Sequence, residues 1–226
     1  QRSLQQLSNI VRTLGADLGV LLDTGGEKIF LVDEKGDVLS GDLALALVAL
    51  LVILTRPPAR IVIPVTVSRA IERMAEEHGF QVTRSRSTAR ALTEAALAPD
   101  VALVGEEMGG LIFPAFHPAF DGMSAVVRIL EMMARLDVRL HQLTRAVPES
   151  HVVRLGVPCP DERKVAVMRR LIEATKGADV ELVEGVRVRM GEDWVAAIPD
   201  ADRATFHVVA EAGDRDRAQR LAEEFR

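Results

Sequence analysis

An internal repeat constrains the fold of this chain more than any other feature of its sequence. The segment DLGVLLDTGGEKIFLVD, which begins at Asp17, aligns with DVALVGEEMGGLIFPAF, which begins at Asp100. At this spacing of 83 residues, Ile29 coincides with Ile112 and the two glycine-rich turns coincide. Each copy predicts an apolar strand, a turn that carries acidic residues, and a second apolar strand.

The second copy is preceded by a segment that has no counterpart before the first copy. Residues 60–64 and 80–83 predict strands, and residues 68–78 between them predict a helix. With the helices expected at 88–97 and 121–136, the second unit becomes β-α-β-α-β-β-α, with a mostly parallel sheet between helices. A two-stranded first unit would have unpaired edges. We therefore expect the chain to be a piece of a longer protein, although a degenerate half-domain or a chance match would also explain the pattern.

The last part of the chain has a different pattern. Short strand-like segments separated by polar turns alternate with two helical ones. The strands are expected at 151–157, 180–183, 186–190, 194–198 and 205–210, and the helices at 160–175 and 215–225. The chain is therefore expected to be an α/β protein of repeated mixed-sheet units, the first truncated, followed by a small α+β domain with an antiparallel sheet.

Composition narrows the function classes. The net charge is −5, and the chain has no Tyr, one Trp and one Cys. A basic aromatic platform for nucleic acid, a disulfide framework and a thiolate metal cluster are therefore not expected. The apolar run 43–54 is too short to span a bilayer and predicts a helix buried on all sides, against residues 56–142 or a second copy of the chain. With its polar first residues, the sequence suggests a cytoplasmic protein that binds neither nucleic acid nor membrane.

Three segments carry a resemblance to a known family. They are DEKGDVLSGD at 33–42, GEEMGGLIFP at 105–114, and HPAFDGM at 117–123, which precedes an apolar helix. The sequence resembles the α-D-phosphohexomutases, which include phosphomannomutase and phosphoglucomutase. It resembles still more closely the mutase-like module that follows a sugar-phosphate nucleotidyltransferase in mannose-1-phosphate guanylyltransferases.

The resemblance implies a division of the chain into parts of a four-domain mutase. Residues 1–55 resemble the end of the second domain, 56–142 the third and 150–226 the fourth. The family's catalytic serine lies in the first domain, so no catalytic residue is assigned here, and the chain alone is expected to be inactive. The implied partners are the missing N-terminal domains, with a nucleotidyltransferase among the candidates, and a second copy in a homodimer.

The resemblance also implies a metal loop at residues 23–28, which read DTGGEK. The family motif D-G-D-G-D-R holds Mg²⁺ with three carboxylates, a donor set that suits this cation. Here Asp23 is kept, Gly25 replaces the second Asp and Glu27 replaces the third. Asp23 and Glu27 are therefore the candidate metal ligands, with Mg²⁺ weak or absent. The alternative interpretation is a solvated hairpin turn.

Sugar and phosphate contacts are implied for two further segments. Glu106 in GEEMGG matches a glutamate that bonds sugar hydroxyls in the family motif G-E-E-S-G-H. Arg84, Arg86 and Arg90 precede or begin an expected helix, and a ligand-binding lysine of the family falls near Arg86. Either segment could instead be a solvated turn or loop.

The expected phosphate loop of the last domain departs from the family. Residues 198–204 read IPDADRA where the family has R-P-S-G-T-E-P, so an arginine is lost and two aspartates are gained. Negative charge at this loop disfavours binding of a phosphate dianion. The family reaction is phosphoryl transfer within a hexose phosphate, of mannose or glucose. The alternative is a non-catalytic module that binds a sugar phosphate, or serves regulation or assembly, beside a mannose-1-phosphate guanylyltransferase.

Overall fold

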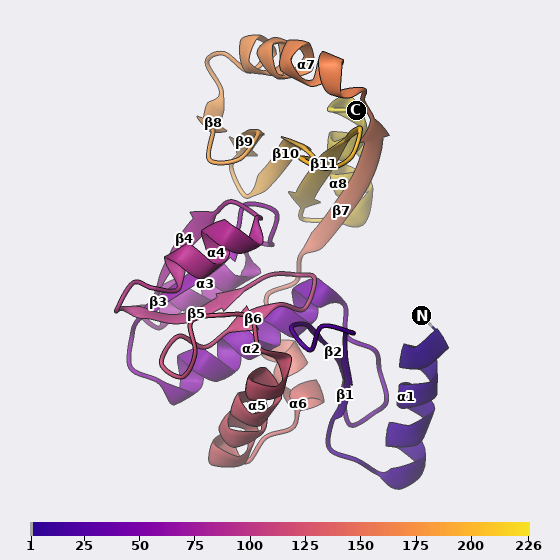
Figure 1. Ribbon diagram of the computed structural model, residues 1–226, viewed down its shortest axis with the longest axis vertical. Coiled ribbons are helices and arrows are strands. Elements are labelled where there is room, and N and C mark those ends of the chain that lie inside the picture. Colours follow the sequence, from indigo (N-terminus) through magenta and orange to yellow (C-terminus); the bar gives the residue numbers. More distant parts are fainter. Residues whose placement is uncertain (1) are drawn as a thin grey trace. The chain divides into compact units, whose positions relative to one another are not determined.

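The computed structural model describes residues 2–226, which form two compact units that divide between Pro148 and Glu149. The α/β class expected from the sequence is confirmed: the first unit is α/β with a mixed sheet, and the second is built on an antiparallel sheet (Figure 1).

The first unit contains a four-stranded sheet in the order β4-β3-β5-β6. Strands β3, β4 and β5 are parallel, and β6 runs antiparallel to β5, as the second repeat predicts. The strand bounds are β3 Arg60–Pro64, β4 Gln81–Ser85, β5 Val101–Gly105 and β6 Leu111–Ile112. The helices around it are α2 Gly41–Thr55, α3 Ala70–Glu77, α4 Ala89–Ala95, α5 Gly122–Leu136 and α6 Leu140–Leu143, followed by the 3-10 turn Thr144–Ala146.

The first repeat forms an antiparallel hairpin that follows helix α1 (Arg2–Leu14) in the chain. Its strands are β1 (Gly19–Leu22) and β2 (Ile29–Val32), and they make a two-stranded sheet, as expected. Neighbouring chain segments pair with both ends of β2. Isolated bridges join Val32 to Val38, and Lys28, just before β2, to Gly110. The hairpin is thereby attached to the loop that joins β5 to β6.

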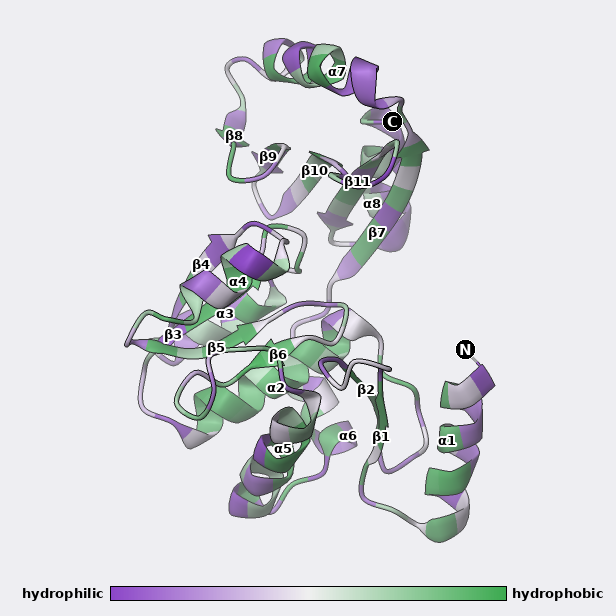
Figure 2. Ribbon diagram, in the orientation of Figure 1, coloured by the Kyte–Doolittle hydropathy of each residue, from purple (hydrophilic) through white to green (hydrophobic). Residues whose placement is uncertain are grey.

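Helix α2 lies in the middle of this unit and is apolar from Leu43 to Leu54 (Figure 2). Every residue from Leu45 to Ile53 is buried. It packs against α3, α5 and β5 of the second repeat and against β2 of the first. The expectation that this helix is covered by residues 56–142 is therefore confirmed. None of the described helices combines the length and the apolar character that a bilayer crossing requires.

Helix starts follow the side chains that the sequence supplies. Ser40, Thr88 and Asp121 each accept a hydrogen bond from the backbone N–H three residues ahead, at the starts of α2, α4 and α5. Asp214 does the same at the last helix.

The second unit is a five-stranded antiparallel sheet in the order β7-β11-β10-β9-β8. Apolar side chains from one face of the sheet pack against helices α7 and α8. The elements are β7 His151–Pro158, α7 Asp161–Ala174, β8 Asp179–Glu181, β9 Val186–Met190, β10 Asp193–Pro199, β11 Thr205–Ala212 and α8 Arg215–Glu224. Every strand and both helices expected here are present, with ends that differ by a few residues.

Residues 1–55 and 56–142 share a single hydrophobic core in the first unit, which joins β2 and α2 to the four-stranded sheet and α5. Their assignment to two different mutase domains therefore stays a prediction.

Truncating α2 at a buried position should destabilise the first unit. We expect Leu51→Ala, at a fully buried side chain, to lower its free energy of unfolding by about 2–5 kcal/mol. Leu54→Ala, at a 42% exposed side chain three residues on, should cost less than about 1 kcal/mol. Urea titration followed by amide NMR intensities of the first unit measures both, with Trp194 of the second unit as an internal reference. Equal losses in the two variants would contradict the central placement of α2.

Candidate functional site

Two glycine-rich loops occupy equivalent positions in the two repeats. Residues 23–28 join β1 to β2, and residues 105–110 span the turn from β5 to β6. The backbone N–H of Ile29 donates to the Gly109 carbonyl at 3.0 Å. The two loops that the sequence singled out are therefore side by side in one unit.

An ion pair joins the same two loops. Lys28 Nζ lies 2.7 Å from Glu106 Oε1, and the Glu106 side chain is only 12% exposed. Sequence reasoning assigned Glu106 to sugar contact and left Lys28 without a role. The alignment of the two turns in the repeat was the signal that could have suggested their contact.

The backbones at this junction approach very closely. Gly109 has φ +93, and a Cβ there would lie 2.3 Å from the Ile29 carbonyl oxygen. At Gly110, where the family motif has His, a Cβ would lie 2.7 Å from both Glu106 Oε1 and the Phe120 ring. One cavity that Glu106 lines together with residues of β2 and α2 measures about 90 Å³, below the ~300 Å³ at which small-molecule pockets begin.

The metal loop offers two carboxylates. Asp23 Oδ1 accepts hydrogen bonds from the backbone N–H groups of Glu27 and Lys28, at 2.9 and 3.1 Å. This turn is held together by Asp23 itself, and its second oxygen and the exposed Glu27 carboxylate are available for a cation. Two carboxylates on a tight turn suit a hard cation such as Mg²⁺, but they are fewer than the three of the family motif.

A Cβ at Gly25 would make only ordinary contacts, the nearest 3.7 Å from Asp23 Oδ2 and 3.8 Å from Glu27 Cγ. The backbone there does not have a positive φ, unlike the next residue, Gly26. A side chain at position 25 therefore fits the loop as it stands.

A second group of possible metal ligands is formed by Asp33, Asp37 and His141, whose ligand atoms all lie within 4.8 Å of one another. Asp33 is buried, and its Oδ1 accepts from the backbone of Lys35 and Asp37 while its Oδ2 lies 3.1 Å from His141 Nδ1. Asp33 thus holds a turn and ties it to α6, which accounts for its burial without a cation.

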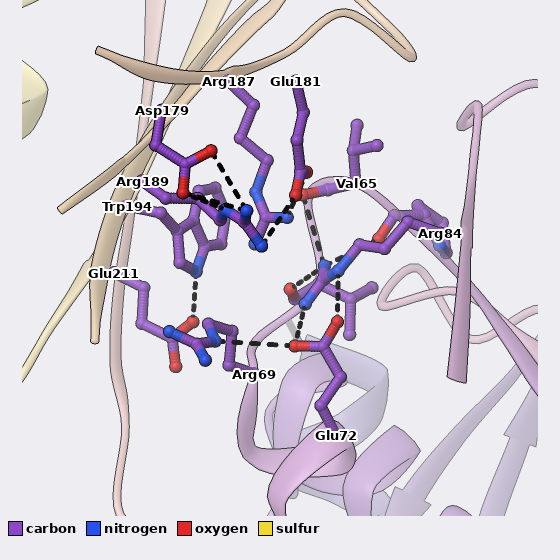
Figure 3. Close-up of polar contacts among 12 residues, drawn as sticks. Val65, Arg69, Glu72, Arg84, Asp179, Glu181, Arg187, Arg189, Trp194 and Glu211 are labelled. Carbon is purple, nitrogen blue, oxygen red and sulfur yellow. Dashed lines mark hydrogen bonds and ion pairs between the residues drawn. The ribbon is translucent and has the colours of Figure 1, made fainter. Parts of the chain in front are cut away.

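The hydrogen bonds of Arg84 hold elements of the first unit together. Its guanidinium forms a bidentate pair with Glu72 at 2.8 and 2.9 Å and donates to the carbonyls of Pro64, Val65 and Val67 (Figure 3). The side chain is only 9% exposed, so Arg84 fastens the ends of β3 and β4 to α3.

Arg86 and Arg90 are exposed, unlike Arg84. Arg90 pairs with Glu94 one helical turn ahead, at 2.8 Å, and this hydrogen bond raises the pKa of its guanidinium. The three candidate arginines therefore differ in role, although the sequence presents them as one cluster.

The loop 199–204 of the second unit is closed by its own carboxylate. Asp200 Oδ1 accepts from the backbone N–H groups of Asp202 and Arg203, both at 2.9 Å, and Oδ2 accepts from His207 Nε2 at 2.7 Å. Hydrogen bonding, from His207 above all and then from Asp202, lowers the pKa of Asp200 to about 2. Backbone donors in the loop thus already hold an anion, the Asp200 side chain.

Oppositely charged side chains also pair between the adjacent strands β8 and β9 of the second unit. The sequence did not indicate these pairs. Arg189 forms a bidentate pair with Asp179 on the adjacent strand, at 3.0 Å for both bonds (Figure 3). Arg187 lies 2.7 Å from Glu181 and over the Trp194 ring, 4.4 Å from its centroid. These pairs follow the strand register, which brings residues 179 and 181 opposite 189 and 187.

A comparison with known proteins shows which protein family has a similar sequence in this region. Residues 40–151 match the family model "Phosphoglucomutase/phosphomannomutase, alpha/beta/alpha domain III". Residues 40–151 are a domain III of the phosphoglucomutase/phosphomannomutase family. The match covers the second repeat, including the loop 105–110, together with the preceding helix α2.

Relatives extend the similarity to the whole chain. The probable phosphoglucosamine mutase of Methanopyrus kandleri is 30% identical over 227 residues, which cover 99% of this chain and 50% of that protein. The phosphoglucomutase/phosphomannomutase of Thermococcus kodakarensis is 26% identical, with 99% of this chain and 49% of that protein covered. The chain thus spans about half the length of the curated relatives it matches.

Solved structures share the fold. A phosphoglucomutase/phosphomannomutase family protein from Burkholderia thailandensis has a TM-score of 0.84 at 22% identity, covering 99% of this chain and 48% of that one. The N-acetylphosphoglucosamine mutase of Aspergillus fumigatus, in complex with GlcNAc-6P and magnesium, has a TM-score of 0.70 at 14% identity, covering 96% and 55%.

The lowered pKa of Asp200 predicts that the folded state loses stability at low pH. The folded state favours the charged carboxylate, so this contribution to stability is present above the ordinary pKa of 3.8 and is lost as pH falls through about 2. We expect the ¹³C carboxyl resonance of Asp200 to titrate near pH 2, and His207→Leu to move the midpoint upward. An identical midpoint in the two proteins would show that His207 does not hold the carboxylate.

Proposed function

We propose that this chain is a phosphohexomutase-type module that binds a hexose phosphate at the loops 23–28 and 105–110 and is catalytically inactive by itself. The observation that carries the proposal is the hydrogen bond between Ile29 N and Gly109 O, because it brings the candidate metal loop against the loop that bears Glu106. A carboxylate that accepts from sugar hydroxyls would thus stand beside one that favours a cation.

A hexose phosphate suits the charges of the first unit. Glu106 would accept from sugar hydroxyls, while Arg86 and Arg90 would attract the phosphate, as family resemblance suggests. Arg84 would contribute by holding the chain around Arg86, since its own donors bond to Glu72 and to carbonyls. The similarity to probable phosphoglucosamine mutases favours glucosamine phosphates beside mannose and glucose phosphates as ligands.

The proposed inactivity concerns the two groups that phosphoryl transfer needs, a full set of metal ligands and a phosphorylated nucleophile. The metal loop supplies two carboxylates, Asp23 and Glu27, and Mg²⁺ bound there would neutralise charge on a transferring phosphoryl group. No residue of this chain is proposed as the phosphorylated nucleophile. Asp23 would hold the cation weakly, because one of its oxygens already accepts two backbone hydrogen bonds.

The closed loop of the second unit favours a second candidate function. Asp200 occupies the backbone donors of a loop that, by family resemblance, would receive the substrate phosphate. A module that binds sugar phosphate without transforming it, and regulates an attached sugar-phosphate nucleotidyltransferase, would tolerate this change. Such a fusion is the arrangement that the sequence resemblance suggests.

Restoring the third carboxylate should create a stronger cation site. Because a side chain at position 25 meets only ordinary contacts, we expect Gly25→Asp to raise Mg²⁺ affinity by about tenfold or more. Gly25→Asn has nearly the same shape without the charge and should give a much smaller gain. Magnesium titration, followed by the amide shifts of residues 24–28, measures both. Equal effects of the two substitutions would contradict the assignment of Asp23 and Glu27 as ligands.

Hexose phosphates should bind weakly, with a Kd on the order of millimolar. We expect mannose 1-phosphate or glucosamine 6-phosphate to shift the amides of 25–28, 86–90 and 105–110, and Glu106→Gln to weaken binding several-fold. Glu107→Gln is the matched control, because the neighbouring Glu107 carboxylate bonds Thr66 instead.

In the same samples, a coupled assay for mannose 6-phosphate should remain at background. Turnover that Asp23→Ala abolishes would contradict the proposed inactivity, and the absence of amide shifts in these loops would contradict binding.

A further inference from the structure

A groove of about 460 Å³ lies at the opposite end of the first unit's parallel strands from the two candidate loops. The loop 105–110 follows the carboxyl end of β5, and the loop 23–28 is joined to it by the hydrogen bond from Ile29 to Gly109. The groove is lined where β5 begins and just before β3 begins. The end of α2 and the second half of α5 form its other sides. Its volume is within the ~300–1,000 Å³ range of small-molecule sites.

Three arginines converge on this groove around one carboxylate. Glu131 pairs with Arg128 and with Arg135, each at 2.7 Å through a different oxygen. Arg56, at the end of α2, also lines the groove, and among residues 2–226 its side chain has no hydrogen-bond or ion-pair partner. Asp100 also lines the groove, but its carboxylate pairs with Arg60 at 2.8 Å. Three guanidinium groups against the two carboxylates of the lining leave an excess of positive charge.

The arginines stand beside apolar side chains. Phe113 and Met132 line the groove and are otherwise almost fully buried, at 4% and 5% exposed. Arg128 is additionally held 5.6 Å from the centre of the Phe116 ring. A groove lined by both cationic and apolar side chains is complementary to an anion that carries an apolar body.

We propose that this groove binds a small organic anion, a phosphate or carboxylate attached to an apolar group, at a site separate from the hexose-phosphate loops. The anionic group pairs with Arg56 and shares Arg128 and Arg135 with Glu131. The apolar group contacts Phe113 and Met132.

Glu131 acts in this site as an internal competitor. Its hydrogen bond from Arg128, together with the nearby charges of Arg135 and Arg56, lowers its pKa, so its carboxylate is charged at neutral pH. Removing this charge leaves the guanidinium groups of Arg128 and Arg135 without their carboxylate. A substitution of Glu131 should therefore strengthen binding, the opposite of what substitution of a ligand contact does.

Phenyl phosphate is the probe that tests the proposal, titrated into the ¹⁵N-labelled chain of residues 1–226. We expect saturable amide shifts at residues 56, 59, 102 and 128–135, with a Kd on the order of millimolar. Arg56→Gln should weaken binding by at least about fivefold, and Glu131→Gln should strengthen it several-fold. Inorganic phosphate, which has no apolar body, should bind several-fold more weakly.

The control variant is Arg145→Gln, which removes an exposed arginine of the same unit outside the groove and should leave the affinity unchanged. Unchanged amide dispersion verifies that each variant is folded. No saturable shift at the groove, unaltered binding in Arg56→Gln, weaker binding in Glu131→Gln, or equal affinity for inorganic phosphate would each overturn the proposal. Because the loop amides report separately, this result is independent of hexose-phosphate binding.

Discussion

The burial of helix α2 on all its faces is the constraint on which the first unit depends. A helix without a polar face cannot lie at the boundary with water, so protein must cover every side. Its residues 45–53 are all buried, and its neighbours come from both repeats: β2 from the first, and α3, α5 and β5 from the second. Residues 1–55 are therefore part of the same core as the four-stranded sheet, although the sequence places them in a different repeat.

This shared core fixes the two candidate loops against each other. Because α2 packs on both β2 and β5, the turns at the ends of those strands come within hydrogen-bond distance. The contact leaves no space for a Cβ at Gly109, where the Ile29 carbonyl would lie 2.3 Å away. A change of conformation in one loop must therefore move the other, which couples the candidate cation position to Glu106.

The elements of this fold could be predicted from the sequence because apolar periodicity and capping residues act locally. The repeat predicted both hairpin-like turns, and the strand at 60–64 was predicted to the residue. The partners of charged side chains could not be predicted, since they depend on tertiary neighbours. Arg84 looks like a free cation in RSRSTAR, but Glu72 and the carbonyls near it belong to other elements. The closure of the loop 199–204 likewise depends on His207, which β11 brings opposite Ile198.

The pairing of charges within the chain explains why ligand binding should be weak at each of these places. An external anion must compete with a carboxylate that is already there, and it gains only the difference between the two interactions. The intramolecular pairs are Lys28 with Glu106, Arg84 with Glu72, and Arg128 and Arg135 with Glu131.

In the loop 199–204 the carboxylate of Asp200 itself takes the backbone donors. Arg56 differs from the other groove arginines, because no carboxylate of the described chain lies within ion-pair distance of it. An anion that meets Arg56 therefore breaks no ion pair of that arginine and competes with Glu131 only for Arg128 and Arg135.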